Sequence, residues 1–207
     1  MKLKQCEKSE LTREKILDAA VDEFAEKGFW GARVDAIAES SGINKRMIYA
    51  HFESKEKLYS KVLLIAYEWV AECERRFMVE ESDPVTSIRN IIAKEFDFLS
   101  ENSKFVRLLM WENLNRALYI PRDELIKLKT PTFEFIRRQV RRGKEAGIFS
   151  HEVDEHQMVL SLMTFGFAYF SNAHTLSALL GSDLTTKENV QKRSDFISDM
   201  IIKYLCV

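Results

Sequence analysis

The chain has 207 residues, of which 46% are hydrophobic and 30% charged, and its formal net charge is −1. This length allows one large domain, or a small domain joined to a larger one. The composition excludes a disordered chain, and only 7 Gly and 3 Pro argue against a many-stranded sheet. Since the net charge does not indicate a nucleic-acid partner, a case for DNA binding depends on where the charges lie.

The N-terminal part of the chain predicts three helices. Thr12 is a suitable N-cap, and apolar residues then recur at helical spacing until Gly28. A short second helix ends at Gly42, which suits a turn that requires positive φ. Asn44 can cap a third helix that runs through Phe52.

The middle of the chain predicts longer helices. Ser54 caps a helix whose apolar stripe continues to about Met78, long enough to bridge two domains. Asp83-Pro84 is a cap followed by proline at the first helical position, and Thr130-Pro131 repeats this signal. Between them, residues 105–118 predict a helix that is apolar on nearly every side, followed by a loop or a short helix.

The C-terminal part predicts two further helices. Asp154 begins a helix that includes residues 157–182, a stretch without Lys, Arg, Asp or Glu. This stretch contains many polar residues and is flanked by acids, whereas a membrane-spanning helix needs roughly 20 mainly apolar residues and a positive cytoplasmic flank. We therefore expect a buried helix and no membrane association. No strand pattern is present, so the sequence predicts an all-α fold.

The cysteines and the N-terminus indicate the compartment. Cys6, Cys73 and Cys206 are far apart and odd in number, which suits neither a disulfide framework nor a zinc site. The polar N-terminus lacks the apolar core of an export signal. The sequence predicts a cytoplasmic protein, associated with the nucleoid if it binds DNA, without a cofactor.

Two short helices joined by a tight turn are typical of a helix-turn-helix, whose second helix enters the major groove. Residues 1–60 hold equal numbers of basic and acidic residues, but residues 44–61 hold five Lys or Arg against two Glu. When the residues expected to face the core are set aside, the remaining surface of the second helix is cationic and rich in hydrogen-bonding groups. Its outward side chains are Lys45, Arg46, Met47, Tyr49, Ala50 and His51.

The same segment carries a recognisable pattern: Ile37-Ala38, Gly42-Ile43, Tyr49-Ala50-His51-Phe52, Lys55 and Leu58. An Ile-Ala pair, a Gly-Val/Ile turn and Tyr-x-His-Phe-x-x-Lys followed by Leu resemble the DNA-binding region of TetR-family regulators. The resemblance covers about residues 10–60. It implies an N-terminal three-helix helix-turn-helix domain (1–60) and a larger helical ligand-binding and dimerisation domain (61–207).

The resemblance also implies contacts with DNA. By it, Tyr49, His51 and Lys55 contact phosphates, and Thr12 adds a contact from the first helix. The predicted DNA-binding residues are Thr12, Arg33, Asn44, Lys45, Arg46, Tyr49, Ala50, His51 and Lys55.

Four of these positions bear on the operator sequence. Lys45 and Arg46 are the candidates for reading bases, since either can donate to guanine O6 and N7. Arg33 departs from the family's capping Thr, so a helix cap is lost while the guanidinium can bind a phosphate. Ala50 replaces a larger residue, and it either packs on a thymine methyl or leaves a gap.

The resemblance implies a homodimer formed through the last two long helices. A helix that is apolar all round supports this, because it needs a partner besides its own core; the alternative is burial within one chain. The predicted interface residues are Val159, Met163, Gly166, Phe170, Phe196 and Met200. Two-fold symmetry suits a palindromic double-stranded DNA operator with half-sites about one helical turn apart.

The helical body is also expected to bind a small-molecule effector. Glu112 lies in an apolar run, so it either pairs with Arg116 one turn on, which we favour, or faces a polar ligand group. The predicted ligand-binding residues are Trp69, Phe96, Trp111, Glu112, Asn115, Phe133 and Phe167. Their aromatic members are plausible pocket walls, although each such residue is more often plain core.

Metal binding and enzymatic activity are not expected. Residues 151–156 contain metal-ligand types, but histidines five apart are not a recognised spacing, and Asp154 as N-cap explains the acids. Since no catalytic motif is present, the sequence predicts a DNA-binding, ligand-responsive repressor. The alternative is a helical small-molecule-binding protein without DNA binding.

Overall fold

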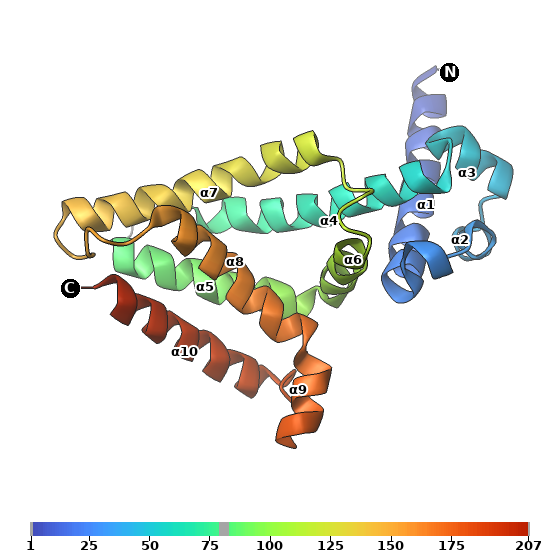
Figure 1. Cartoon of the computed structure of the whole chain (residues 1–207). Helices are drawn as coiled ribbons and strands as arrows, with labels where there is room; N and C mark the ends of the chain where they lie inside the picture. Colours follow the sequence, from blue (N-terminus) through green and yellow to red (C-terminus); the bar gives the residue numbers. More distant parts are fainter. Residues whose placement is uncertain (1, 79–82, 207) are drawn as a thin grey trace. The chain divides into compact units, whose positions relative to one another are not determined.

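The computed structural model describes residues 2–78 and 83–206, with side chains in 7–76, at 78 and in 83–206. These ranges contain no strand, only an isolated bridge between Phe149 and Cys206, so the all-α prediction is confirmed. The helices (Figure 1) are α1 (Lys2–Gly31), α2 (Val34–Ser41), α3 (Lys45–Phe52), α4 (Lys55–Phe77), α5 (Pro84–Glu101), α6 (Ser103–Leu114), α7 (Arg122–Glu145), α8 (Glu155–Ser171), α9 (Ala173–Leu180) and α10 (Lys187–Leu205).

The chain divides into two compact units. The first comprises Met1–Glu68 and Arg107–Leu125, and the second comprises Trp69–Val106 and Ile126–Val207. Most of α6 therefore belongs to the unit that contains α1, α2 and α3. The predicted division after residue 60 did not anticipate this, because an apolar helix gives no indication in the sequence of which unit it packs on.

The first unit contains the predicted helix-turn-helix. Gly42 has φ 68° and follows the last residue of α2, as its predicted role in the turn requires. The Asn44 side chain accepts a hydrogen bond from the Met47 N–H and caps α3, which ends at Phe52 as predicted. Arg33 precedes α2 without a side-chain cap, as expected from the loss of the capping Thr.

The first helix begins earlier than predicted, whereas its predicted end at Gly28 coincides with a break in the helical backbone. It begins at Lys2, so Thr12 lies inside α1, where its hydroxyl donates to the Lys8 carbonyl at 2.8 Å instead of capping. The Lys- and Glu-rich residues before Thr12 are good helix formers, which explains the extension. At Gly28 the backbone leaves helical geometry (φ 65°, ψ −178°), and one further turn follows to Gly31.

The helix predicted over residues 105–118 ends earlier, at Leu114. Arg116 and Ala117 then adopt left-handed φ values of 59° and 56°, which reverse the chain within a few residues. The Ala117 N–H donates to the Glu112 carbonyl at 3.0 Å and closes this turn.

The next helix begins nine residues before the predicted start at Pro131. Its first residue is Arg122, and Asp123 and Glu124 in the first turn interact favourably with the positive end of the helix dipole. Pro131 lies inside α7, and the Thr130 hydroxyl donates to the Ile126 carbonyl rather than capping a helix. The helix start predicted from the cap-plus-proline signal is therefore wrong here.

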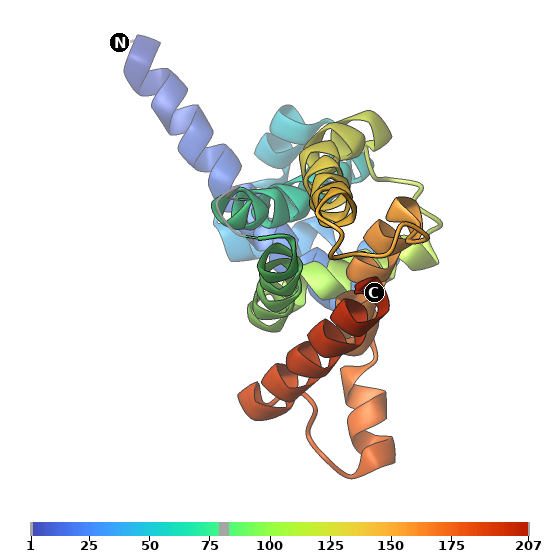
Figure 2. The same ribbon diagram turned by 90° about the vertical axis from the view of Figure 1, so that its left-hand side faces the viewer.

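The second unit is built around α5, which contacts α8 and α10 (Figures 1 and 2). Its core includes Ile88, Ile92 and Phe96 of α5, each at most 1% exposed. The predicted uncharged helix is broken at Asn172 into α8 and α9, after which the chain turns back into α10. No helix in the described residues is long and apolar enough to cross a membrane.

Candidate functional site

The exposed face of α3 is the first element of the site. Ile48 and Phe52 are 1% and 6% exposed and fix α3 to the body of the first unit. Ile37 of α2 is fully buried and holds the other side of the turn. The opposite face of α3 carries exposed Lys45 and Arg46, together with Tyr49, Ala50 and the half-buried His51. The predicted amphipathic pattern of this helix is confirmed.

Lys45 has an acidic partner in the protein without DNA. Its Nζ lies 2.9 Å from Oδ1 of Asp35 on α2, and both side chains are exposed. The hydrogen bond with Asp35 raises the pKa of Lys45 above its ordinary value. A base contact by Lys45 therefore requires DNA to compete with Asp35 for the ammonium group. No sequence pattern indicated this pair, which joins two helices across the turn.

Lys55 is positioned by an aromatic ring. Its ammonium lies 4.8 Å from the centroid of Phe29, a cation–π contact, and burial lowers its pKa. On α1, Thr12 is half-buried. Arg33, which precedes α2, is exposed, and its backbone N–H donates to Glu23 at 3.0 Å. The contacts of these residues with DNA stay predictions.

The seven predicted effector contacts are divided between the two units. Trp111, Glu112 and Asn115 belong to the first unit, whereas Trp69, Phe96, Phe133 and Phe167 belong to the second.

Trp111 and Asn115 contact α1. The Trp111 indole donates to the Ala25 carbonyl at 3.3 Å, and its ring lies so close to Gly28 that a Cβ there would come within 2.5 Å. Asn115 Oδ1 accepts from the Trp30 indole N–H at 3.2 Å. Sequence reasoning missed these contacts of Trp30 and Gly28, because residues about 85 positions apart carry no local sign of their pairing.

Glu112 is only 4% exposed. Its Oε1 accepts hydrogen bonds from the backbone N–H groups of Tyr119 at 2.7 Å and Ile120 at 3.0 Å. The preferred pairing with Arg116 is wrong, because α6 ends at Leu114 and Arg116 does not lie one helical turn on. The carboxylate instead holds the α6–α7 loop.

The second unit contains a buried polar cluster that sequence reasoning missed. Lys129 pairs with Glu74, and the Thr132 hydroxyl donates to the other Glu74 oxygen at 2.5 Å. The Lys129 ammonium also lies 5.8 Å from the ring centroid of Phe133. Burial, opposed by the charge of Lys129, raises the pKa of nearby Glu95 to about 8.

The other aromatic candidates of this unit differ in burial. Phe96 is 1% exposed and packs against Tyr169 and Phe170 at centroid distances of 5.9 and 5.8 Å. This is the environment of a core residue. Trp69 and Phe167 are half-buried.

The predicted dimer residues fall into two groups. Phe196, Met163 and Met200 are 59%, 38% and 38% exposed, which leaves them available to a partner, and Phe170 is half-buried. Val159 and Gly166 are buried within the single chain, so they face its own core instead of a second subunit. A helix that is apolar all round has no periodicity that would distinguish these two faces.

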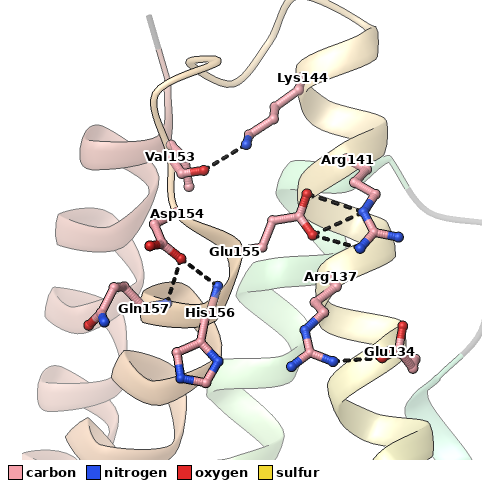
Figure 3. Close-up of polar contacts among 9 residues, drawn as sticks. All are labelled: Glu134, Arg137, Arg141, Lys144, Val153, Asp154, Glu155, His156 and Gln157. Carbon is pink, nitrogen blue, oxygen red and sulfur yellow. Dashed lines mark hydrogen bonds and ion pairs between the residues drawn. The ribbon is translucent and has the colours of Figure 1, made fainter.

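The candidate metal segment has a structural explanation (Figure 3). Asp154 accepts hydrogen bonds from the N–H groups of His156 and Gln157 at 2.8 and 3.1 Å and caps α8 as predicted. Glu155 forms an ion pair with Arg141, with Nη2 and Oε2 2.9 Å apart. Within the described part of the chain, no three His, Cys, Asp or Glu side chains are grouped to hold a metal ion.

A three-helix unit with an exposed cationic helix after a glycine turn, joined to a helical body, defines a helix-turn-helix DNA-binding regulator. Two family models match the chain: "Bacterial regulatory proteins, tetR family" over residues 16–62 and "Tetracyclin repressor-like, C-terminal domain" over residues 84–201. The chain belongs to the TetR family of transcriptional regulators.

Individual relatives agree with this assignment. The chain is 31% identical to the HTH-type transcriptional repressor NicS of Pseudomonas putida, over 97% of this chain and 95% of NicS. It is 29% identical to the HTH-type transcriptional regulator RutR of Escherichia coli, over 86% and 85% of the two chains. A TetR regulator from Chloroflexus aurantiacus has the same fold, with a TM-score of 0.74, 22% identity and coverage of 97% and 99%.

Proposed function

We propose that this regulator is a repressor that binds a palindromic operator as a homodimer and releases it when a small-molecule effector binds. It acts on DNA at the nucleoid in the cytoplasm. The observation that carries the proposal is the exposed α3 face with Lys45, Arg46 and Tyr49, held in place by a buried opposite face. NicS, which is similar over nearly the whole chain, is named a repressor.

Exposed apolar side chains on α8 and α10 support dimerisation. Each of these helices buries one face in the second unit and leaves large hydrophobic residues on another. The exposed residues are Leu160, Met163, Phe196, Met200 and Tyr204. Monomeric proteins rarely expose large apolar patches, which commonly mark interfaces. A two-fold dimer in turn requires an operator with two-fold symmetry.

The continuous helix α4 supports control by an effector. It has 23 residues, Lys55–Phe77, and at 1.5 Å per residue it is about 34 Å long. An effector that binds better to one position of α4 than to another shifts the equilibrium between them and so changes the separation of the two recognition helices.

The test is selection of DNA fragments from the source genome by the purified protein. We expect a palindromic site, whose affinity falls about 100-fold between 50 and 200 mM salt if Arg33 and Lys55 of both subunits neutralise phosphates. The variant Arg46→Ala is expected to lose enrichment, whereas Lys203→Ala on α10 keeps it. A dimeric wild-type protein that enriches no site would refute the proposal and favour a ligand carrier.

A further inference from the structure

The ion pair between Asp35 and Lys45 places a hydrogen-bond acceptor beside a base-reading candidate. The Lys45 ammonium lies 2.9 Å from Oδ1 of Asp35 and 3.1 Å from Oδ2, so both carboxylate oxygens contact it. The Lys45 and Asp35 side chains are 49% and 60% exposed. Since an exposed ion pair stabilises a fold only slightly, the consequence of this pair is expected at the surface that meets DNA.

The helix-turn-helix fixes where the pair lies. Val34 and Ile37 of α2 are 7% and 0% exposed, and they leave Asp35 on the outward side of that helix. Lys45 is the first residue of α3, which Asn44 caps. The pair therefore joins the starts of the two helices, and the first residues of a recognition helix are those that contact base edges.

The pair can contact a base without separating. An ammonium group has three N–H donors, so Lys45 can donate to DNA while it keeps a hydrogen bond with Asp35. A carboxylate has about four lone-pair positions, so Asp35 can accept a further hydrogen bond as well. Together the two side chains present a donor and an acceptor 2.9 Å apart on one exposed surface.

The major-groove edge of a G·C base pair is complementary to this arrangement. Guanine presents the acceptors N7 and O6, and cytosine presents its N4 amino group as a donor. Guanine O6 and cytosine N4 are hydrogen-bonded to each other within the base pair, so they lie about 2.9 Å apart. Lys45 can therefore donate to O6 while Asp35 accepts the second amino hydrogen of the cytosine.

Other base pairs fit less well. An inverted C·G pair places the amino group against the ammonium of Lys45 and the O6 acceptor against the carboxylate of Asp35, and both contacts are then unfavourable. A T·A pair keeps the order of acceptor and donor, but it offers Lys45 one acceptor and a methyl group where guanine offers two acceptors.

We propose that Asp35 is a specificity-determining residue, which accepts a hydrogen bond from the cytosine amino group of the same base pair whose guanine Lys45 contacts. This role adds a base contact from α2 to those expected from α3. It rests on the proposed function, because a base preference requires an operator. Asp35 also repels phosphates, so it lowers the affinity for all DNA while it raises the discrimination between sequences.

The experiment measures base preferences with the full-length protein. Each base pair of the operator half-site is replaced by the other three, and affinities are measured by fluorescence anisotropy for the wild type, Lys45→Ala and Asp35→Asn. Lys45→Ala identifies the G·C pair, because it loses the preference there. Inversion of this pair in both half-sites should weaken wild-type binding about tenfold or more. For Asp35→Asn we expect about threefold or less, because an amide both donates and accepts.

Glu39→Gln is the matched control. Glu39 is an exposed acid four residues after Asp35 on α2, so its substitution removes the same charge from the same helix, and inversion should cost this variant as much as the wild type. The proposal is wrong if Asp35→Asn keeps the wild-type cost of inversion, if it loses preference at a different base pair, or if Lys45→Ala keeps every preference. A wild-type protein that selects no operator gives a different result, which refutes the proposed function together with this role of Asp35.

Discussion

Gly28 is the position where one added methyl group should damage the first unit most. Its backbone angles, φ 65° and ψ −178°, belong to a region that is essentially restricted to glycine. A Cβ there would also lie 2.5 Å from the ring of Trp111, closer than any relaxed contact. Gly28→Ala thus combines backbone strain with a collision.

The two costs can be sized separately. Backbone strain of this kind costs about 1–3 kcal/mol, and forcing a packed side chain aside costs a further ~1–3 kcal/mol. We expect Gly28→Ala to lower the free energy of unfolding by about 2–6 kcal/mol, the sum of the two costs and a large share of typical domain stability. Gly42→Ala is the control: Gly42 has φ 68° but no atom within 4 Å of an added Cβ, so it carries only a left-handed cost of about 1–2 kcal/mol.

Urea unfolding, followed by circular dichroism and tryptophan fluorescence, measures the difference. A double-mutant cycle isolates the collision, because in the Trp111→Ala background Gly28→Ala should lose only its backbone cost. Equal losses of about 1 kcal/mol for Gly28→Ala and Gly42→Ala would mean that Trp111 does not press on α1, and would refute the reasoning.

Three further variants test other parts of the chain. Asp35→Asn should raise operator affinity several-fold in a fluorescence anisotropy titration, because it frees Lys45 and removes a negative charge facing DNA; unchanged affinity contradicts this. Burial raises the pKa of Glu95 to about 8, so wild-type stability should fall between pH 5 and 8 by at most about 1.4 kcal/mol per unit, because the unfolded carboxyl ionises first. The stability of Glu95→Gln, measured by urea unfolding, should lack this fall. A pH dependence identical to that of the wild type would contradict the role given to Glu95. Phe196→Glu should convert the dimer to a monomer in light scattering, whereas Lys187→Glu should leave it dimeric. If both variants remain dimers, the interface lies elsewhere.

Local signals in the sequence predicted the turn and the helix cap of the helix-turn-helix. Gly42 and Asn44 act through their own backbone neighbourhood, so a turn and a cap can be inferred from residue type and spacing alone. The same holds for Asp154 at the start of α8. The same type of signal failed at Thr130-Pro131, where the acids that start α7 several residues earlier outweighed the cap.

Contacts between distant segments were beyond prediction. The Lys45–Asp35 pair, the Lys129–Glu74 pair and the contact between Trp111 and Gly28 each join helices whose pairing no periodicity reports. Periodicity indicates that a side chain is buried, but not against which helix.

Trp111 illustrates why this matters for function. An aromatic residue on an apolar helix fits an effector pocket or a packing contact, and from the sequence alone the packing contact is the more common of the two. The structure gives Trp111 a ring contact with Gly28 and a hydrogen bond to Ala25, both on α1. Trp111→Ala should therefore lower the stability of the first unit by about 3–5 kcal/mol. Weaker induction in that variant counts as evidence for an effector contact only if operator affinity without effector stays at the wild-type value.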